Sequence, residues 1–200
     1  MKFGARLTPS IPPMSAGTKM GICIGVVDVG EQPCTFKGKT NYKEQILIVI
    51  EFPGEKIEID GEMKPRQLSR AFTRTTSDRG AFKQILSAWF AKNFTEDELI
   101  EFDMDSLLLK PCMVTVKLSE DGQYANIDNI MQYPDGIPAP TTTTVPYTFD
   151  MESWDEKAFK ALPEWIQEKI KKSTQYATLH APQTVIAVKA EVSAEEAWPI

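Results

Sequence analysis

The chain has 200 residues, of which 42% are hydrophobic and 25% charged, and its formal net charge at pH 7 is −6. This length allows one domain of about 140 residues with an appendage, or two small domains. The net acidity argues against uniform affinity for nucleic acid. No apolar run reaches the length of a membrane-spanning helix, and the N-terminus lacks the apolar stretch of a signal peptide. We therefore expect a cytoplasmic protein.

The cysteines and the charges narrow the class further. Cys23, Cys34 and Cys112 are widely spaced and odd in number, which fits neither a disulfide framework nor a zinc site. Two of them lie in apolar runs typical of buried positions. Residues 64–83 contain six bases and one acid, whereas residues 95–105 contain six acids and no base. Such segregation indicates either two solvated faces of opposite sign or two binding surfaces.

The first half of the chain reads mainly as strands. Residues 1–18 are Pro-rich and predict an arm. Glycine-interrupted β-branched residues at 19–30 predict a strand with a bend or bulge, and residues 31–43 a loop. The apolar run at 44–52 predicts a central strand buried on both faces. Asp60-Gly61 predicts a hairpin turn that leads into a strand at 66–75.

A helix and two further strands follow. Ser77 or Asp78 is expected to cap a helix that extends to about Lys92, and a capping box is expected at the start of the acidic segment 95–102. Residues 111–133 predict a hairpin that turns at Glu120-Asp121-Gly122. The predicted fold is mainly β: an OB-fold-like, five-stranded Greek-key barrel with an inserted helix, over residues 19–133. Other small barrels and α+β domains share much of this order.

The C-terminal third has a different composition. Four prolines and four consecutive threonines at 134–146 predict a linker, and residues 147–173 a helical segment. Its apolar side needs a surface to bury against, either the barrel, which is favoured, or another chain. That side comprises Trp154, Phe159, Trp165, Ile166 and Ile170. Residues 174–200 are expected to form a flexible tail with an acidic-apolar tip, with an edge strand at 183–192 as an alternative.

Chemistry-bearing motifs are scarce. The sequence has one histidine, and it contains no common nucleophile, metal-protease or nucleotide-binding motif. We expect a binding protein rather than an enzyme, with no cofactor and no metal. A nuclease that holds metal ions with carboxylates is the least favoured alternative.

The strand at 66–75 carries the main binding hypothesis. Strict alternation places one set of side chains on a single face: Arg66, Leu68, Arg70, Phe72 and Arg74. Three guanidinium groups cannot share a core, so this face is expected to point outward and the small Ser, Ala and Thr side chains inward. Guanidinium groups bind phosphates and an aromatic ring stacks on a base, as a single-strand binder requires. An edge strand kept soluble by arginines is the alternative.

Further binding residues are expected beside this strand. The loop between the first two strands and the last hairpin border the binding groove of an OB-fold. The candidates there are Lys37, Lys39, Tyr42, Lys43, Lys117 and Tyr124. The Tyr124 ring has packing in the hairpin as its alternative role.

The chain ends in Glu195-Glu196-Ala197-Trp198-Pro199-Ile200. A barrel, a Pro-rich linker and an acidic tail with an apolar tip resemble the layout of bacterial single-stranded DNA-binding proteins. Here the aromatic residue precedes the proline, and two acids are present. The resemblance implies that Glu195, Glu196, Trp198, Pro199 and Ile200 recruit replication or recombination proteins, with the acids on a basic rim and the apolar end in a pocket.

Longer stretches carry a second resemblance. They are "SAGTKMGICIGVVDVGEQ", "GEMKPRQLSRAFT", "FDMDSLLLKPCMVTV", "YANIDNI" and "WDEKAFKALPEWIQEKIKKS". These resemble a family of small bacteriophage proteins regarded as single-stranded DNA-binding proteins of replication and recombination modules. The resemblance implies an OB-fold that binds single-stranded DNA in the cytoplasm of a bacterial host, as a monomer or a homo-oligomer. The alternative is an acidic protein-interaction module, an accessory or host-takeover factor, that uses Thr95–Asp105 as its contact surface.

Overall fold

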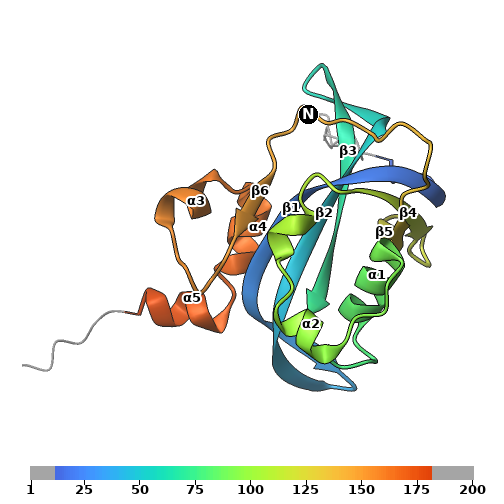
Figure 1. Cartoon of the computed structure of the whole chain (residues 1–200). Helices are drawn as coiled ribbons and strands as arrows, with labels where there is room; N and C mark the ends of the chain where they lie inside the picture. The colour runs from blue at the N-terminus through green and yellow to red at the C-terminus, as the bar shows by residue number, and fades with distance from the viewer. Residues whose placement is uncertain (1–11, 182–200) are drawn as a thin grey trace, which may run out of the picture.

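Figure 1 shows the computed structural model of the chain, in which residues 12–181 are described. Residues 1–11 and 182–200 lie outside the described residues. They include most of the predicted arm, the alternative strand at 183–192 and all five predicted partner-binding residues of the tip. Within residues 12–181, no helix has the length and apolarity that crossing a membrane requires.

The described chain is mainly β, with one six-stranded sheet. The sheet order is β3-β2-β1-β4-β5, and β6 pairs with β1. The strands are β1 (Gly17–Phe36), β2 (Lys39–Ile59), β3 (Glu62–Thr73), β4 (Pro111–Leu118), β5 (Ala125–Gln132) and β6 (Tyr147–Phe149). All pairs are antiparallel except β1 with β6. The helices are α1 (Ala81–Phe90), α2 (Glu96–Ile100), the 3-10 helix η1 (Met104–Leu107), α3 (Glu156–Ala161), α4 (Glu164–Ile170) and α5 (Thr174–Leu179).

The β1–β2 hairpin is longer than predicted, and the prediction of a loop at 31–43 is wrong. Pairing continues to Phe36 and Lys39, so only Lys37 and Gly38 form the turn. Both have positive φ, 48° and 75°, as a type I′ turn requires. The Thr35 and Thr40 hydroxyls lie 3.0 Å apart across the strands, a pairing that favours a ladder. The Asp60-Gly61 hairpin prediction is confirmed by the same φ signs.

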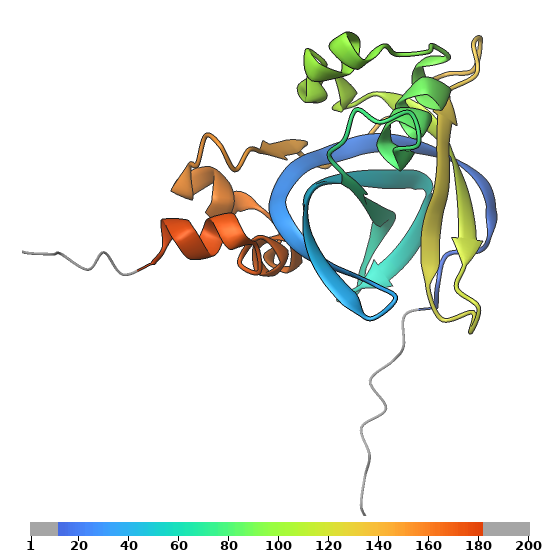
Figure 2. The same ribbon diagram turned by 90° about the horizontal axis from the view of Figure 1, so that it is seen from below.

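The sheet curls strongly, and Figure 2 shows β3 brought round to lie beside β5. Backbone pairing along the described sheet ends at these two strands. The Arg70 guanidinium of β3 bridges them, because it donates to the Ile127 and Asp128 carbonyls of β5 at 3.1 and 2.5 Å. Register shifts in β1 after Cys23 and after Asp28 confirm the predicted irregularity, and such bulges increase strand twist.

The inside of the curl holds the larger core, which α1 covers at one side. Trp89 of α1 is buried in it, and its indole N–H donates to the Pro111 carbonyl at 3.0 Å. The predicted cap at Ser77 or Asp78 is wrong, since the helix begins after Gly80 without a side-chain cap. Asp78 instead pairs with Lys83 at 2.5 Å. The capping box of Thr95 and Glu98 is confirmed.

A second core lies on the outer face of β1 and β2. It joins these strands to residues 147–170 through Val27, Leu47, Phe159, Ile166 and Ile170, among others. Residues 46–52 are therefore buried on both faces, as predicted, whereas Glu44 at the start of the predicted strand is exposed. The helical segment docks on the sheet of its own chain. Figure 1 shows α3, α4 and α5 gathered on this side.

Glycine at position 25 permits the closest approach in this second core. A Cβ at Gly25 would lie 2.6 Å from the Tyr147 ring of β6, well inside van der Waals contact. The strand β6, which was not predicted, can therefore pair with β1 only because position 25 has no side chain.

Residues 134–146, here called the strap, contain neither helix nor strand, in line with their composition. The strap is nevertheless fastened to the sheet. Thr142 and Thr144 each donate a hydroxyl hydrogen bond to the Glu51 carboxylate of β2, at 2.5 Å, and Gln67 donates to it at 3.1 Å. Glu51 is only 1% exposed, so its carboxylate has lost its hydrating water, and these three donors take the place of that water.

Candidate nucleic-acid interface

The two faces of β3 are the reverse of the prediction. Phe72 is 2% exposed and its ring lies 5.8 Å from the Phe82 ring, while Leu68 packs against the same core. The exposed face instead carries Gln67, Ser69 and Ala71, followed by the partly exposed Thr73. We call these four residues the outward row. The prediction that the arginine face points outward is wrong, and Phe72 cannot stack on a base from its buried position.

The arginines share the inner face without sharing the core. Arg70 is satisfied by the two β5 carbonyls, and Arg66 donates to the Pro12 carbonyl at 2.7 Å. Arg74 follows the end of β3, where it pairs with Asp28 at 3.7 Å and Glu152 at 3.5 Å. A buried cation is costly when it lacks partners, and each of these three arginines has one. The arginine side chains also leave the apolar interior at these positions.

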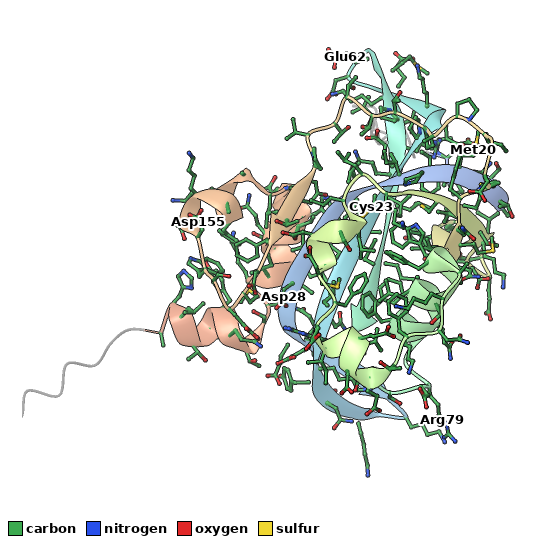
Figure 3. All side chains as sticks on the ribbon, viewed as in Figure 1. Met20, Cys23, Asp28, Glu62, Arg79 and Asp155 are labelled. Carbon is green, nitrogen blue, oxygen red and sulfur yellow. The ribbon has the colours of Figure 1, made fainter. Side chains whose placement is uncertain are left out.

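A groove of about 770 Å³ lies where the outward row meets the β1–β2 hairpin and the loop before α1. We call it the hairpin groove. It brings together three predicted binding residues, Tyr42, Lys43 and Arg74, with Arg79. Figure 3 places Arg79 at one end of the molecule and Glu62, where β3 begins, at the other. The hairpin groove is therefore at the C-terminal end of β3.

The hairpin groove has the chemistry of a phosphate-and-base site. Lys43 and Arg79 can neutralise phosphates, whereas Arg74 already pairs with Asp28 and Glu152, and the Tyr42 ring, 55% exposed, offers a face for stacking. The hydroxyl groups of Thr75 and Ser77 add donors of the kind that contact phosphate oxygens. Glu31 and Glu44 also line it, and their carboxylates reduce its positive charge; Glu31 accepts a hydrogen bond from the Thr174 hydroxyl at 2.6 Å.

The other predicted residues lie apart from this groove. Lys37 and Lys39 are exposed at the hairpin tip. Lys117 pairs with Asp128 at 2.9 Å, and Tyr124 is exposed at the start of β5. Neither of the last two lines the hairpin groove.

Sequence reasoning missed two residues. Arg79 was part of the basic run but was not assigned to the site, because its position depends on how the loop before α1 folds back. Trp165 was assigned to the buried side of its helix, yet it is 48% exposed. Its neighbours Ile166 and Ile170 are four positions apart and fully buried, so they define the buried stripe and turn the preceding residue outward. That spacing was the available signal.

The acidic segment forms a separate groove of about 840 Å³ beside β6. Its lining includes Asp103, Asp105 and Glu152 together with Ile100, which is 72% exposed. Asp28 also lines it, and burial raises the pKa of its carboxyl above the usual value, against the lowering effects of the Gly30 N–H and of Arg74. Among residues 12–181, no three His, Cys, Asp or Glu side chains gather as a metal-binding group.

Comparison with protein families, with curated proteins and with solved structures finds no match for this chain. Its function is therefore inferred from its own residues.

Proposed function

We propose that the protein binds single-stranded DNA, with little sequence preference, through the hairpin groove and the outward row of β3. We also propose that the curled sheet is an OB-fold. The strand order, the antiparallel pairing, the approach of β3 to β5 and the position of α1 between β3 and β4 support this fold. In an OB-fold, the face of the second and third strands binds oligonucleotides.

The observation that carries the proposal is the composition of the hairpin groove. Lys43, Arg74 and Arg79 surround a half-exposed Tyr42 ring, beside a strand face whose side chains are short enough to let a nucleic-acid chain approach. Stacking on an aromatic ring is tolerant of sequence, because every base has a π face. In line with the family resemblance, we propose a role in phage DNA replication or recombination, with residues 195–200 recruiting partner proteins.

Fluorescence anisotropy of a labelled oligo-dT of about 30 nucleotides, over a salt series and with a duplex control, tests the proposal. We expect tight binding to the single strand that weakens steeply with salt. The double variant Lys43→Glu, Arg79→Glu removes two phosphate contacts. It should lower the slope of log K against log salt by about 1.4, at about 0.7 per contact. Tyr42→Ala should cost about 1–3 kcal/mol of binding free energy.

A matched control separates the site from the net charge. Lys157→Glu, Lys172→Glu makes the same change in charge at exposed positions on and after the C-terminal helices. This control should retain the salt slope. Equal effects of the two double variants, or no binding by the original protein at low salt, would contradict the proposal.

The acidic groove favours one second candidate function, a protein-interaction module. Asp103, Asp105 and Glu152 beside the exposed Ile100 offer negative charge around an apolar contact, which suits a basic, apolar segment of another protein. If the protein binds no oligo-dT at low salt, and if Ile100→Asp abolishes its binding to a protein partner, the second function is supported instead.

A further inference from the structure

A second groove, of about 740 Å³, lies toward the N-terminal end of β3. We call it the tryptophan groove, because Trp165 of α4 forms part of its wall opposite the outward-row residues Gln67 and Ser69. Thr143 and Thr144 of the strap also line it. The groove is thus built jointly by the sheet and by the C-terminal segment that docks on it.

The charges of the tryptophan groove favour an anionic occupant. Its lining includes Lys64 and Arg66, and none of the described residues that line it is an acid. The nearby Glu51 carboxylate is buried and accepts hydrogen bonds from Thr142, Thr144 and Gln67. Lys64 also pairs with the exposed Glu62 carboxylate at 3.2 Å, and Arg66 donates to the Pro12 carbonyl, so a negatively charged ligand in this groove would share these cations with their present partners.

The tryptophan groove and the hairpin groove are joined along β3. Gln67 and Ser69 of the outward row line the first, and Ala71 and Thr73 line the second. Alternate residues of a strand share one face, so the row is a continuous surface between the grooves. From Gln67 to Thr73 it extends about 20 Å, at about 3.3 Å per residue. One single strand that covers several nucleotides can reach both, since an OB-fold covers about 4–16 nucleotides.

The helix that carries Trp165 is held in place before any ligand arrives. Ile166 and Ile170 of the same helix are fully buried in the second core, and the strap beside the ring is fastened to Glu51. Binding to a side chain on a fixed helix loses less conformational freedom than binding to a mobile loop. The exposed half of the indole is therefore a preformed flat surface at the edge of the outward row.

We propose that Trp165 is a base-stacking platform, and that the strand of DNA passes from the tryptophan groove along the outward row to the hairpin groove. The appended C-terminal segment is then part of the nucleic-acid interface rather than only a cover for the sheet. This inference rests on the proposed single-strand binding, and it adds a second aromatic contact at the far end of β3 from Tyr42.

Tryptophan fluorescence and anisotropy of the full chain, titrated together with oligo-dT, test the inference. Trp165→Ala should weaken binding about 5- to 140-fold, the effect of removing one base–aromatic stack. Trp165→Phe keeps a ring and should retain most of the affinity. Stacking on a base should quench part of the indole emission of the original protein, and this part should be lost in Trp165→Phe, which keeps three other tryptophans and still binds by anisotropy.

Two controls define the outcomes. Leu179→Ala removes an exposed apolar side chain on α5 and should change neither signal. Thermal unfolding of Trp165→Phe, which keeps a ring at this half-buried position, should stay close to that of the original protein. If the original protein binds oligo-dT but Trp165→Ala binds equally well, or if Trp165→Phe is quenched as strongly as the original protein, the inference is wrong and the proposed function stands. If the original protein does not bind at low salt, the proposed function itself is wrong.

Discussion

The two faces of β3 differ in burial, and the polarity of their side chains does not predict this difference. The inner face carries the longest and most charged residues of the strand, yet it contains Phe72 and Leu68 in the core. The outward row is made of Gln67, Ser69, Ala71 and Thr73, which are small or uncharged, yet it faces solvent. Polarity alone would assign the faces the other way round.

Whether a strand face lies inside or outside therefore depends on whether neighbouring groups can satisfy the hydrogen bonds of its polar side chains. Arg70 stays on the inner face because two carbonyls of β5 accept its protons where the sheet has no backbone ladder to close it. Its guanidinium also lies 5.0 Å from the Phe72 ring centroid, a cation–π distance. The cation therefore joins the sheet edges, and the small outward residues leave a smooth surface on which a ligand can lie.

Removing the apolar anchor of the inner face should have the largest effect. Phe72→Ala should lower the free energy of unfolding by about 3–5 kcal/mol, because a buried ring is replaced by a cavity in the core. Urea denaturation followed by circular dichroism measures this value. A loss below about 1 kcal/mol would mean that Phe72 is not buried as described.

Removing the bridge between β3 and β5 should have the next largest effect. Arg70→Met keeps an unbranched side chain but loses the charged donors to the Ile127 and Asp128 carbonyls, at a cost of about 1.5–3 kcal/mol per hydrogen bond to a charged group, less any re-solvation of the carbonyls. Arg70→Lys should recover only part of the loss, since an ammonium lacks the planar fork. Hydrogen exchange along β5 should rise in Arg70→Met, and equal protection in both proteins would contradict the bridge.

Arg74, at the end of the inner face, pairs with Asp28, and the pH dependence of stability tests the burial of that carboxyl. Burial raises the pKa of Asp28, so the folded state holds this proton longer than the unfolded state, and stability falls as pH rises from about 3.8 through the raised value. Asp28→Asn should therefore gain in melting temperature relative to the original protein over that range, and its amide oxygen can still accept from the Gly30 N–H.

Asp150 provides a control of opposite sign. A hydrogen bond from the Ser153 hydroxyl, at 2.6 Å, lowers the pKa of Asp150. Its ionised form therefore stabilises the fold above the usual carboxyl pKa, and this contribution is lost as pH falls. Asp150→Asn should lose melting temperature relative to the original protein as pH rises. Parallel pH curves for the two variants would contradict both assignments.

Substitution on the outward row should have the smallest effect on stability. Ser69→Glu and Ala71→Glu lie at exposed positions and should change the free energy of unfolding by no more than about 0.5 kcal/mol. Their added charge should nevertheless weaken oligo-dT binding, because the proposed path of the phosphates crosses these positions. Intact binding by the double variant would move the DNA path to another face.

The elements of β3 illustrate how far sequence reasoning reaches. Alternation correctly predicted the strand and grouped its side chains, and Asp60-Gly61 correctly predicted its turn. The choice of face was wrong because the acceptors for Arg70 lie in β5, more than fifty residues later. Tyr42 and Lys43 were predicted as binding residues of a loop, and they are exposed on a strand instead. Their meeting with Arg79 depends on tertiary contacts that no local pattern contains.

The two tryptophans of residues 147–173 show the same limit. Both were expected to be buried, because large rings usually need a surface. Trp154 packs 4.8 Å from the Phe159 ring by centroid, whereas Trp165 faces the tryptophan groove. The spacing of Ile166 and Ile170 places Trp165 outside the buried stripe of its helix, once these two isoleucines are known to form that stripe.

The strap between β5 and β6 has a consequence for modularity. Its composition suggests a domain boundary at residue 134. Residues 1–133 alone, however, would expose the apolar outer face of β1 and β2 and leave Glu51 without its two threonine donors. Such a fragment should self-associate through that face. Any segment that replaced residues 134–181 by recombination would have to supply both an apolar cover and hydroxyl groups at the right place. The sheet and its C-terminal segment therefore form one structural unit.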